Sequence, residues 1–400
     1  MMSTLAHSNR PAHAGSVFAA AILAAAAFVI VTTEYLIVGL LPALSRDLGI
    51  SISLAGQLLT LFAFTVMLFG PPLTAMLAHV NRKPLFITIL LLFAGANTLA
   101  ALAPNIWVLA LARFLPALAL PVFWGMASET AGRLAGPQAA GRAVSQVYLG
   151  ISAALLFGIP LGTLAADTMG WRGAFWMLAA LSLLMAVSLA LWMPAVPGTA
   201  RVSLSQQARL LRDGRVMAHV ALSVLVFSAM FTAYTYLADV LERVMQVPAA
   251  WVGWCLMGFG AVGLVGNYWG GRLVDRNALR STALFAVLLG IAMSIAVLGA
   301  SSLFIWIPAL ALWGLAYTAL FPVCQVRVMQ TAPQAEALAG TLNVAAANAG
   351  TGLGAMLGGA MIAHSGLLTA VLTAVVLALL SGVLAMGWRR LRARCRNLRF

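Results

Sequence analysis

The sequence predicts an all-α membrane protein whose twelve transmembrane helices form two six-helix bundles with pseudo-symmetry. Of its 400 residues, 63% are hydrophobic and 8% are charged, and the mean hydropathy is +1.01. A soluble domain carries about 25% charged residues, so this chain could not cover a water-facing surface. The apolar stretches are about 20–25 residues long, the length a helix needs to cross a bilayer. The alternating segments of about ten residues that form membrane barrels are absent.

Each predicted span is an apolar stretch bounded by polar or turn-forming residues. The spans are residues 17–41, 52–79, 84–103, 106–130, 142–165, 173–193, 216–241, 250–273, 279–299, 303–330, 336–363 and 366–388. The first stretch is longer than the apolar region of a signal peptide, so we expect it to remain in the chain as a transmembrane helix.

The distribution of basic residues predicts the orientation. With both termini in the cytoplasm, 18 of the 23 Lys and Arg residues fall in predicted cytoplasmic segments and three in predicted external loops. Cytoplasmic loops of membrane proteins carry such an excess of Lys and Arg. The same distribution explains the net charge of +14, which in a soluble protein would suggest nucleic acid as a partner.

A polar connector divides the predicted spans six and six. The predicted organisation is a cytoplasmic N-terminus (1–16), an N-terminal bundle (17–193), a cytoplasmic linker (194–215), a C-terminal bundle (216–388) and a basic cytoplasmic tail (389–400). The basic stretch at 79–83, after the second span, is echoed at 274–277, after the eighth. Repeated halves of this kind build secondary transporters, in which the substrate site lies near the midplane between the repeats.

Two ionisable residues inside spans are the first candidates for function, because such groups are costly in lipid. Glu34 and Arg113 each lie about seven residues from the predicted outer end of a span, at a depth of roughly 10 Å. We expect them to face one polar cavity or to pair. Burial and a nearby arginine shift the pKa of a carboxyl group in opposite directions, which suits a proton-coupling site. The alternative is a static ion pair that joins two helices.

Asp239, near the outer end of the seventh span, is a third proton-coupling candidate. Solvation or snorkelling at a helix end would equally explain Asp239, Glu129 and Arg327. Aromatic and amide side chains suggest a substrate cavity for a moderately polar organic solute, although packing is the alternative for each of them. These residues are Tyr35, Trp124, Tyr234, Tyr236, Trp313, Tyr317, Asn343 and Asn348.

Small residues in two spans predict close, sliding contacts between helices. Gly158, Pro160 and Gly162 lie in the fifth span, where the proline also frees a backbone carbonyl. Five glycines lie between residues 350 and 359 of the eleventh span.

Several motifs together resemble the major facilitator superfamily. The stretch containing Gly271, Asp275 and Arg276 resembles the family's cytoplasmic loop motif, with Ala278 where a glycine is usual. Its counterpart after the second span keeps Arg82 and Lys83 but has Ala78 and Asn81 where an aspartate and a glycine are usual. Residues 113–116 resemble the family's arginine motif, with Pro116 in place of glycine, and 158–162 its antiporter motif. The resemblance implies gating and helix-packing roles for Gly158, Pro160, Gly162, Gly271, Arg82, Lys83, Asp275 and Arg276.

Three shorter stretches resemble the drug/proton-antiporter branch, which includes bacterial sugar efflux and purine ribonucleoside efflux transporters. They are residues 32–35, 123–125 and 170–172. The resemblance implies a proton-driven exporter of the inner membrane with Glu34 as a candidate proton site, and it implies a monomer. The alternative is a transporter-like membrane sensor that affects gene expression without net transport.

The sequence lacks the motifs of the other main function classes. It has no nucleotide-binding loop and no His-Glu-x-x-His or Gly-x-Ser-x-Gly arrangement, so we expect no enzymatic activity and no ATP-driven pumping. Cys255, Cys324 and Cys395 are far apart and show no metal-site or disulfide spacing. We therefore expect no cofactor and no metal, and the expected partners are a small-molecule substrate, protons and the lipid bilayer.

Overall fold

The computed structural model describes residues 14–135, 147, 150, 153–198, 211–274, 276–332 and 336–397, which contain helices and no strands. The helical elements are α1 (Ala14–Leu48), α2 (Ile52–Leu77), α3 (Arg82–Ala101), α4 (Ile106–Ala135), η1 (Ala154–Gly158), α6 (Ile159–Trp192), α8 (Gly214–Tyr234), α9 (Leu237–Asp239), η2 (Val240–Val244), α10 (Ala249–Val274), α11 (Ala278–Leu298), α12 (Leu303–Met329), α13 (Glu336–Ser365) and α14 (Leu367–Asn397). The elements η1 and η2 are single turns of π-helix.

The predicted all-α membrane fold is confirmed. Within the described residues, ten helical stretches are long and apolar enough to cross a membrane. One of these is interrupted by Gly170, whose φ of 72° and ψ of 164° break the helical path inside α6. A positive φ costs glycine little because it has no Cβ. The break falls between the predicted spans 142–165 and 173–193. The count of twelve helices and the cytoplasmic location of both termini stay predictions.

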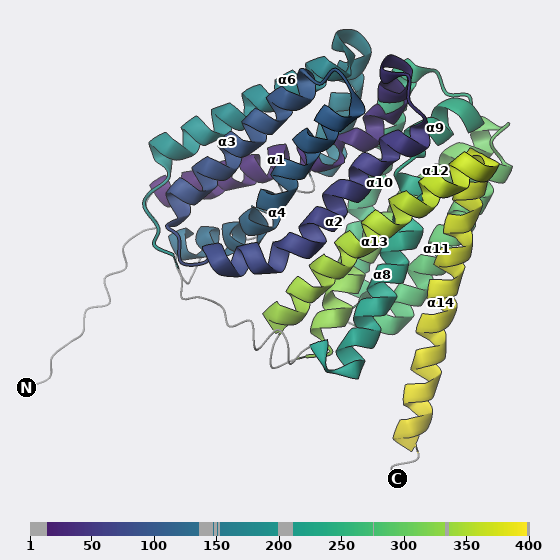
Figure 1. The fold of residues 1–400 in the computed structure, drawn as a ribbon. Helices are drawn as coiled ribbons and strands as arrows, with labels where there is room; N and C mark the ends of the chain where they lie inside the picture. The colour runs from purple at the N-terminus through teal and green to yellow at the C-terminus, as the bar shows by residue number, and fades with distance from the viewer. Residues whose placement is uncertain are drawn as a thin grey trace, which may run out of the picture.

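The helices form two groups that correspond to the two halves of the sequence (Figure 1). In the first group α3 packs on α6, α1 on α6 and α2 on α4. In the second group α8 packs on α13 and α14, α10 on α12, and α11 on α12 and α14. The groups meet where α2 runs beside α13 across the middle of the molecule and where α10 packs on η1 and α6.

Glycines set the closest helix contacts, as the sequence predicts. A Cβ on Gly158 would collide with the side chain of Thr32 on α1, so only glycine allows this approach of the fifth span to the first. On α13, a Cβ on Gly354 would lie 2.6 Å from the carbonyl oxygen of Ser228 on α8. Backbones that approach this closely gain dispersion contacts that larger residues would prevent.

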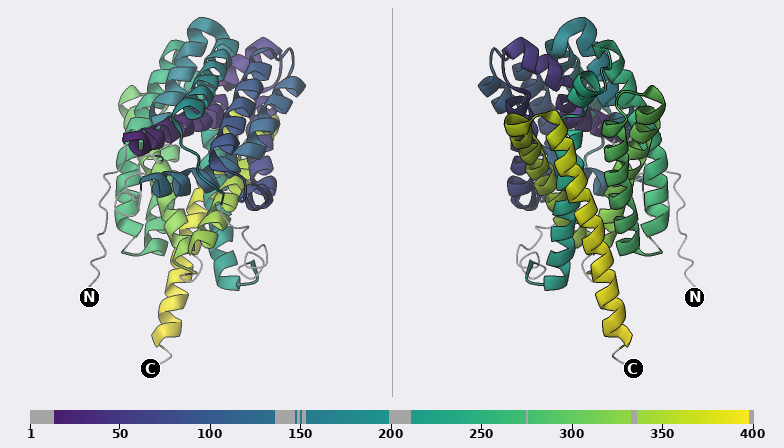
Figure 2. Two further views of the ribbon diagram at one scale, coloured as in Figure 1. Left: turned by 90° about the vertical axis from the view of Figure 1, so that its left-hand side faces the viewer. Right: turned by 90° about the vertical axis from the view of Figure 1, so that its right-hand side faces the viewer.

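Several helix boundaries differ from the predicted ones, and three of the differences matter most. Helix α1 continues past the predicted end at residue 41 to Leu48, and α14 continues past residue 388 to Asn397, so its end projects beyond the neighbouring helices (Figure 2). A helix does not stop where the apolar run ends, because its hydrogen bonds are internal and polar residues continue it in water. The predicted helix 216–241 is broken at Thr235–Tyr236, before α9 and η2.

The start of the predicted linker packs on the N-terminal group. The Arg82 backbone N–H donates to the Val196 carbonyl at 2.9 Å, and Arg133 Nη1 donates to the Pro197 carbonyl at 3.0 Å. Residues 199–210 of the linker and the start of the predicted fifth span, apart from Val147 and Gly150, lie outside the described residues.

Candidate transport site

Arg113 on α4 holds the middle of α1. Its Nη1 donates to the Thr33 carbonyl and its Nη2 to the Glu34 carbonyl, while the guanidinium carbon lies 4.5 Å from the centroid of the Phe62 ring on α2. The side chain is 1% exposed. One arginine therefore ties three helices of the N-terminal half together at a single level.

Glu34 and Arg113 meet, but not as an ion pair. The ion pairs found within 4.0 Å among the described residues do not include the Glu34 carboxylate with Arg113. The arginine instead donates to the backbone oxygen of Glu34, a residue that is 7% exposed, and leaves its carboxylate for other interactions. The predicted depth of Glu34 assumed that the first helix ends at residue 41, but α1 continues seven residues further, to Leu48.

A polar side chain from α3 supports the same turn of α1. Asn97 Nδ2 donates to Thr33 Oγ1 at 3.2 Å, and Thr33 Oγ1 donates to the Val29 carbonyl at 2.9 Å. Both side chains are 2% exposed or less, so these bonds form away from water. The conformation of α1 around Glu34 is thus fixed from two neighbouring helices.

Several of the predicted aromatic cavity residues form one cluster. Tyr234 on α8 stacks on Tyr317 of α12, with ring centroids 4.5 Å apart, and Phe259 of α10 lies 5.6 Å from each of them. Trp313 is buried beside Phe259 at 6.2 Å, and its indole N–H has no hydrogen-bond partner among the described residues.

Tyr35 connects this aromatic cluster to Glu34. Its ring stacks on Phe231 of α8 at 6.0 Å, across the boundary between the two halves of the protein. The Phe231 ring centroid in turn lies 5.9 Å from that of Tyr317 and 5.8 Å from that of Tyr234. Glu34 therefore immediately precedes a side chain that contacts the aromatic residues of the opposite half.

Asp239 is buried and not at a solvated helix end. It is 0% exposed, neither of its carboxylate oxygens accepts a hydrogen bond from a described residue, and its Oδ1 lies 3.4 Å from Nε of the exposed Arg243. It lies at the junction of α9 and the π-helix η2, just beyond the break in the seventh span. Single π-helical turns inside helices often mark functional sites.

The snorkelling interpretation is also wrong for Arg327, which is 1% exposed. Its Nη2 donates to the Ser223 hydroxyl at 2.7 Å and to the His219 carbonyl at 3.1 Å, both on α8, and its Nη1 donates to Thr282 Oγ1 on α11 at 3.1 Å. Ser223 Oγ lies 2.7 Å from Asn343 Oδ1, so this predicted cavity residue belongs to a buried polar network. Glu129, in contrast, is partly exposed, as expected for a helix end.

The other predicted cavity residues lie elsewhere. Trp124 packs edge-to-face on its neighbour Phe123 in the N-terminal half, at 5.6 Å. Tyr236 is fully buried, and its hydroxyl donates to the Ala355 carbonyl at 2.8 Å. Asn348 Nδ2 donates to the Val344 carbonyl of its own helix at 3.0 Å.

Among the predicted gating residues, Arg82 has the most contacts. It is 1% exposed, donates to the Ala78 carbonyl at 3.0 Å and lies 3.5 Å from Glu129 of α4. Lys83 is half-buried beside it. Gly271 has open space around it, whereas Pro160 and Gly162 are buried. Arg276 is exposed, and Asp275 lies outside the described residues.

The two halves touch at the end predicted to be external. Arg46 Nη1 at the end of α1 pairs with Glu242 of η2 at 2.9 Å, and Ser53 Oγ on α2 donates to the Gly359 carbonyl of α13 at 2.7 Å. Of the ion pairs between described residues, this is the one that joins the halves.

Comparison with known proteins identifies the family of this helical membrane fold. The family model described as Major Facilitator Superfamily matches residues 23–344 and 247–397, which together cover most of the chain. The chain belongs to the major facilitator superfamily. It is a multi-pass transporter of this superfamily in the bacterial inner membrane.

The alignments with named relatives cover most of this chain and most of each relative. The chain is 34% identical over 340 residues to the "Inner membrane transport protein YdhP" of Escherichia coli, covering 85% of this chain and 87% of that protein. It is 30% identical over 343 residues to a "Probable sugar efflux transporter" of Helicobacter pylori, covering 85% and 87%. The fold is similar to that of a bacterial homologue of the human lysosomal transporter Spinster. That match has a TM-score of 0.77 and 18% identity, and it covers 95% of this chain and 97% of the other.

Sequence reasoning missed the polar residues that support the candidate site. Asn97, Ser223, Thr282 and Gln325 all make buried or partly buried hydrogen bonds between helices. A polar residue in an apolar span is a usable signal, because lipid does not satisfy its hydrogen bonds. Which partner satisfies it depends on how the helices pack.

Proposed function

We propose that the protein exports a small organic solute by proton antiport, with Glu34 as the group that takes up and releases the proton. The observation that carries this proposal is the position of Glu34. Arg113 of the N-terminal half binds its backbone oxygen, and the adjacent Tyr35 packs on Phe231 of the C-terminal half.

A proton on Glu34 would change the charge at the place where the two halves meet. An ionisable group inside a membrane span is expensive unless it is paired, hydrated or neutral. Because Glu34 precedes Tyr35, which contacts the aromatic residues of the other half, we expect proton uptake at Glu34 and cargo binding at the cluster to affect each other, as antiport requires. Arg113 raises the local positive potential, and Asp239 is the second carboxyl group to test.

The aromatic cluster supports a moderately polar organic cargo. Ligand sites combine aromatic surface with a few polar groups that fix orientation. Tyr35, Tyr234 and Tyr317 offer both ring faces and hydroxyls, and Asn343 with the Arg327 network lies further along the C-terminal half. The relatives named as probable sugar efflux transporters make a sugar the first cargo to test, ahead of a nucleoside or a drug-like compound.

Alternating access would rock the halves 17–193 and 216–388 against each other. The Arg46–Glu242 pair and the Ser53–Gly359 contact would be broken on opening to the outside. Arg82 and Arg327 instead bind within their own halves, so each half can move as a unit. Both halves come from one chain, and we expect a monomer to suffice.

The test is proton release from reconstituted vesicles that contain the full chain. Pentoses, purine nucleosides and cationic drugs would each be added, and the wild type compared with Glu34→Gln and Asp239→Asn. Asp213→Asn is the control, because Asp213 is an exposed carboxylate that forms none of the ion pairs between described residues, and asparagine can also cap α8. We expect one compound to trigger proton movement in the wild type and the control but not in Glu34→Gln.

An equal signal in the wild type and Glu34→Gln would exclude Glu34 as the coupling group. Loss of the signal in Asp239→Asn alone would move that role to Asp239. If a compound binds, but it is not transported and no compound triggers proton movement, the proposal of antiport is wrong. The sensor alternative then takes its place.

A further inference from the structure

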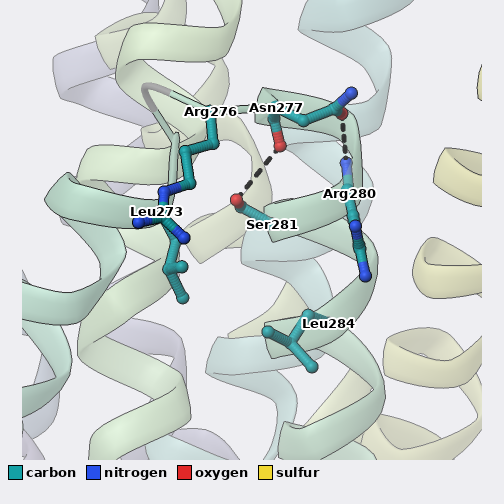
Figure 3. Close-up of a pocket in the computed structure, with 6 residues that line it drawn as sticks. All are labelled: Leu273, Arg276, Asn277, Arg280, Ser281 and Leu284. Atoms are coloured by element: carbon teal, nitrogen blue, oxygen red, sulfur yellow. Dashed lines mark hydrogen bonds between the residues drawn. The ribbon is translucent and has the colours of Figure 1, made fainter.

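A pocket lies away from the candidate transport site, where α10 ends and α11 begins. Its volume is about 410 Å³, and it is lined by Leu273, Arg276, Asn277, Arg280, Ser281 and Leu284 (Figure 3). This size falls within the range of ligand pockets, roughly 300–1,000 Å³. The pocket is at the predicted cytoplasmic end of the C-terminal half.

The polar part of the pocket is positively charged. Figure 3 shows the Arg276 and Arg280 side chains on opposite sides of Ser281, both extending towards the level of the two leucines. No described carboxylate forms an ion pair with either arginine. Guanidinium groups bind phosphate oxygens through paired hydrogen bonds, so an anion with several oxygens fits this pair.

The side-chain oxygen and the carbonyl of Asn277 already accept hydrogen bonds from the first turn of α11. Its Oδ1 accepts from the Arg280 backbone N–H at 2.9 Å, and its carbonyl accepts from Ser281 Oγ at 3.0 Å. These bonds cap the helix and fix the first turn, from which Arg280 projects. The two guanidinium groups are therefore the main groups that can attract an anion here.

The other part of the pocket is apolar and faces outward. Leu284, one turn further along α11 than Arg280, is 51% exposed, and Tyr268 and Trp269 near the same end of α10 are 60% and 47% exposed. In a membrane protein, exposed leucines face lipid, and Tyr and Trp gather at the level of the lipid headgroups. A soluble anion would use the arginines but would gain nothing from the apolar side.

We infer that this pocket binds the phosphate of an anionic phospholipid from the cytoplasmic leaflet, with an acyl chain along Leu284. Basic pockets between helices on the cytoplasmic side of a membrane recognise anionic headgroups in this way. Phosphatidylglycerol meets the requirement for a net negative charge, whereas phosphatidylcholine does not.

Native mass spectrometry of the full chain in detergent tests this site. Dioleoylphosphatidylglycerol and dioleoylphosphatidylcholine would be titrated onto the wild type and onto Arg276→Gln/Arg280→Gln. We expect the double substitution to weaken phosphatidylglycerol binding by about 30-fold, since each arginine near the membrane surface contributes on the order of fivefold. Phosphatidylcholine binding should stay the same.

The matched control is Arg212→Gln/Arg215→Gln, which removes two exposed charges from the same predicted side, outside the pocket. It should bind phosphatidylglycerol as the wild type does. An equal loss in the control would show attraction to overall charge and overturn the site. Equal wild-type binding of the two lipids would also overturn it.

Two further measurements separate the remaining explanations. Arg276→Lys/Arg280→Lys keeps the charge but loses the paired hydrogen bonds of the guanidinium groups, so it should bind phosphatidylglycerol more weakly than the wild type and more tightly than the glutamine pair. Binding as weak as that of the glutamine pair would contradict a site built on charge. If millimolar inorganic phosphate displaced the lipid, the site would recognise a phosphate from solution, and the inference of a lipid would be wrong.

Discussion

Replacing Arg113 with lysine tests whether this residue holds α1 in place. Lysine keeps the positive charge but cannot reach the Thr33 and Glu34 carbonyls with a planar fork while stacking on Phe62. In the structure all three interactions are made by one buried guanidinium.

The expected loss can be worked out from these contacts. Of the two hydrogen bonds that the guanidinium donates, lysine can keep one and loses the other. A hydrogen bond between membrane helices contributes about 0.6–1.7 kcal/mol. Most of the contact with the ring is lost as well, which contributes about 0.5–1 kcal/mol. The cost of burying a positive charge remains, so nothing offsets the loss. The free energy of unfolding should therefore fall by about 1–3 kcal/mol in Arg113→Lys.

The assay is reversible unfolding of the purified protein in mixed micelles with increasing fractions of sodium dodecyl sulfate. Arg272→Lys is the control, because Arg272 is exposed and, among the described residues, its side chain makes one hydrogen bond, to the Tyr268 hydroxyl at 3.1 Å. Its change should stay below about 0.5 kcal/mol. If Arg113→Lys unfolds within that same margin, the forked contact does not hold α1. An equal loss of unfolding free energy in both variants would show that the buried contacts of Arg113 are not the cause.

Two other perturbations test the contact between the halves and the glycine contacts. Arg46→Glu should raise the rate at which an impermeant maleimide labels a cysteine at Ser53, by up to about fivefold for an exposed ion pair, in a chain whose native cysteines are replaced. Adding Glu242→Arg should return the rate to that of the parent, and no recovery would show that the pair does not contribute to closure. Gly354→Leu should lower the free energy of unfolding by about 1–3 kcal/mol or more, because the new side chain meets the α8 backbone. Gly271→Leu, in open space, should not, and equal effects of the two would contradict the packing argument.

Much of the architecture could be predicted because the bilayer constrains the sequence directly. A helix that crosses lipid must be apolar over a fixed length, so hydropathy alone places the spans. Gly170 and the glycines of the eleventh span also have local causes, a positive φ in one case and close backbone approach in the other. The glycines can be recognised in the sequence, whereas the helix that approaches those of the eleventh span, α8, is known only from the packing.

The contacts within the candidate site could not be predicted from the sequence. The sequence predicts similar depths for Glu34 and Arg113, but only helix packing brings the arginine to the Glu34 backbone oxygen and Tyr35 to Phe231 of the other half. Hydropathy gave no reason to expect the break at Tyr236 or the buried position of Asp239, because the apolar pattern continues through both.

The sequence by itself determined that this protein is a bundle of membrane helices, because the length and polarity of each span follow from the solvent around it. The tertiary structure decided which polar groups satisfy one another. In the sequence, Arg327 resembles any arginine near a helix end. In the structure it is buried and donates hydrogen bonds to Ser223 and Thr282, which lie on two other helices. A hydrogen bond between helices depends on the relative rotation and depth of both, and that information is not contained in either segment alone.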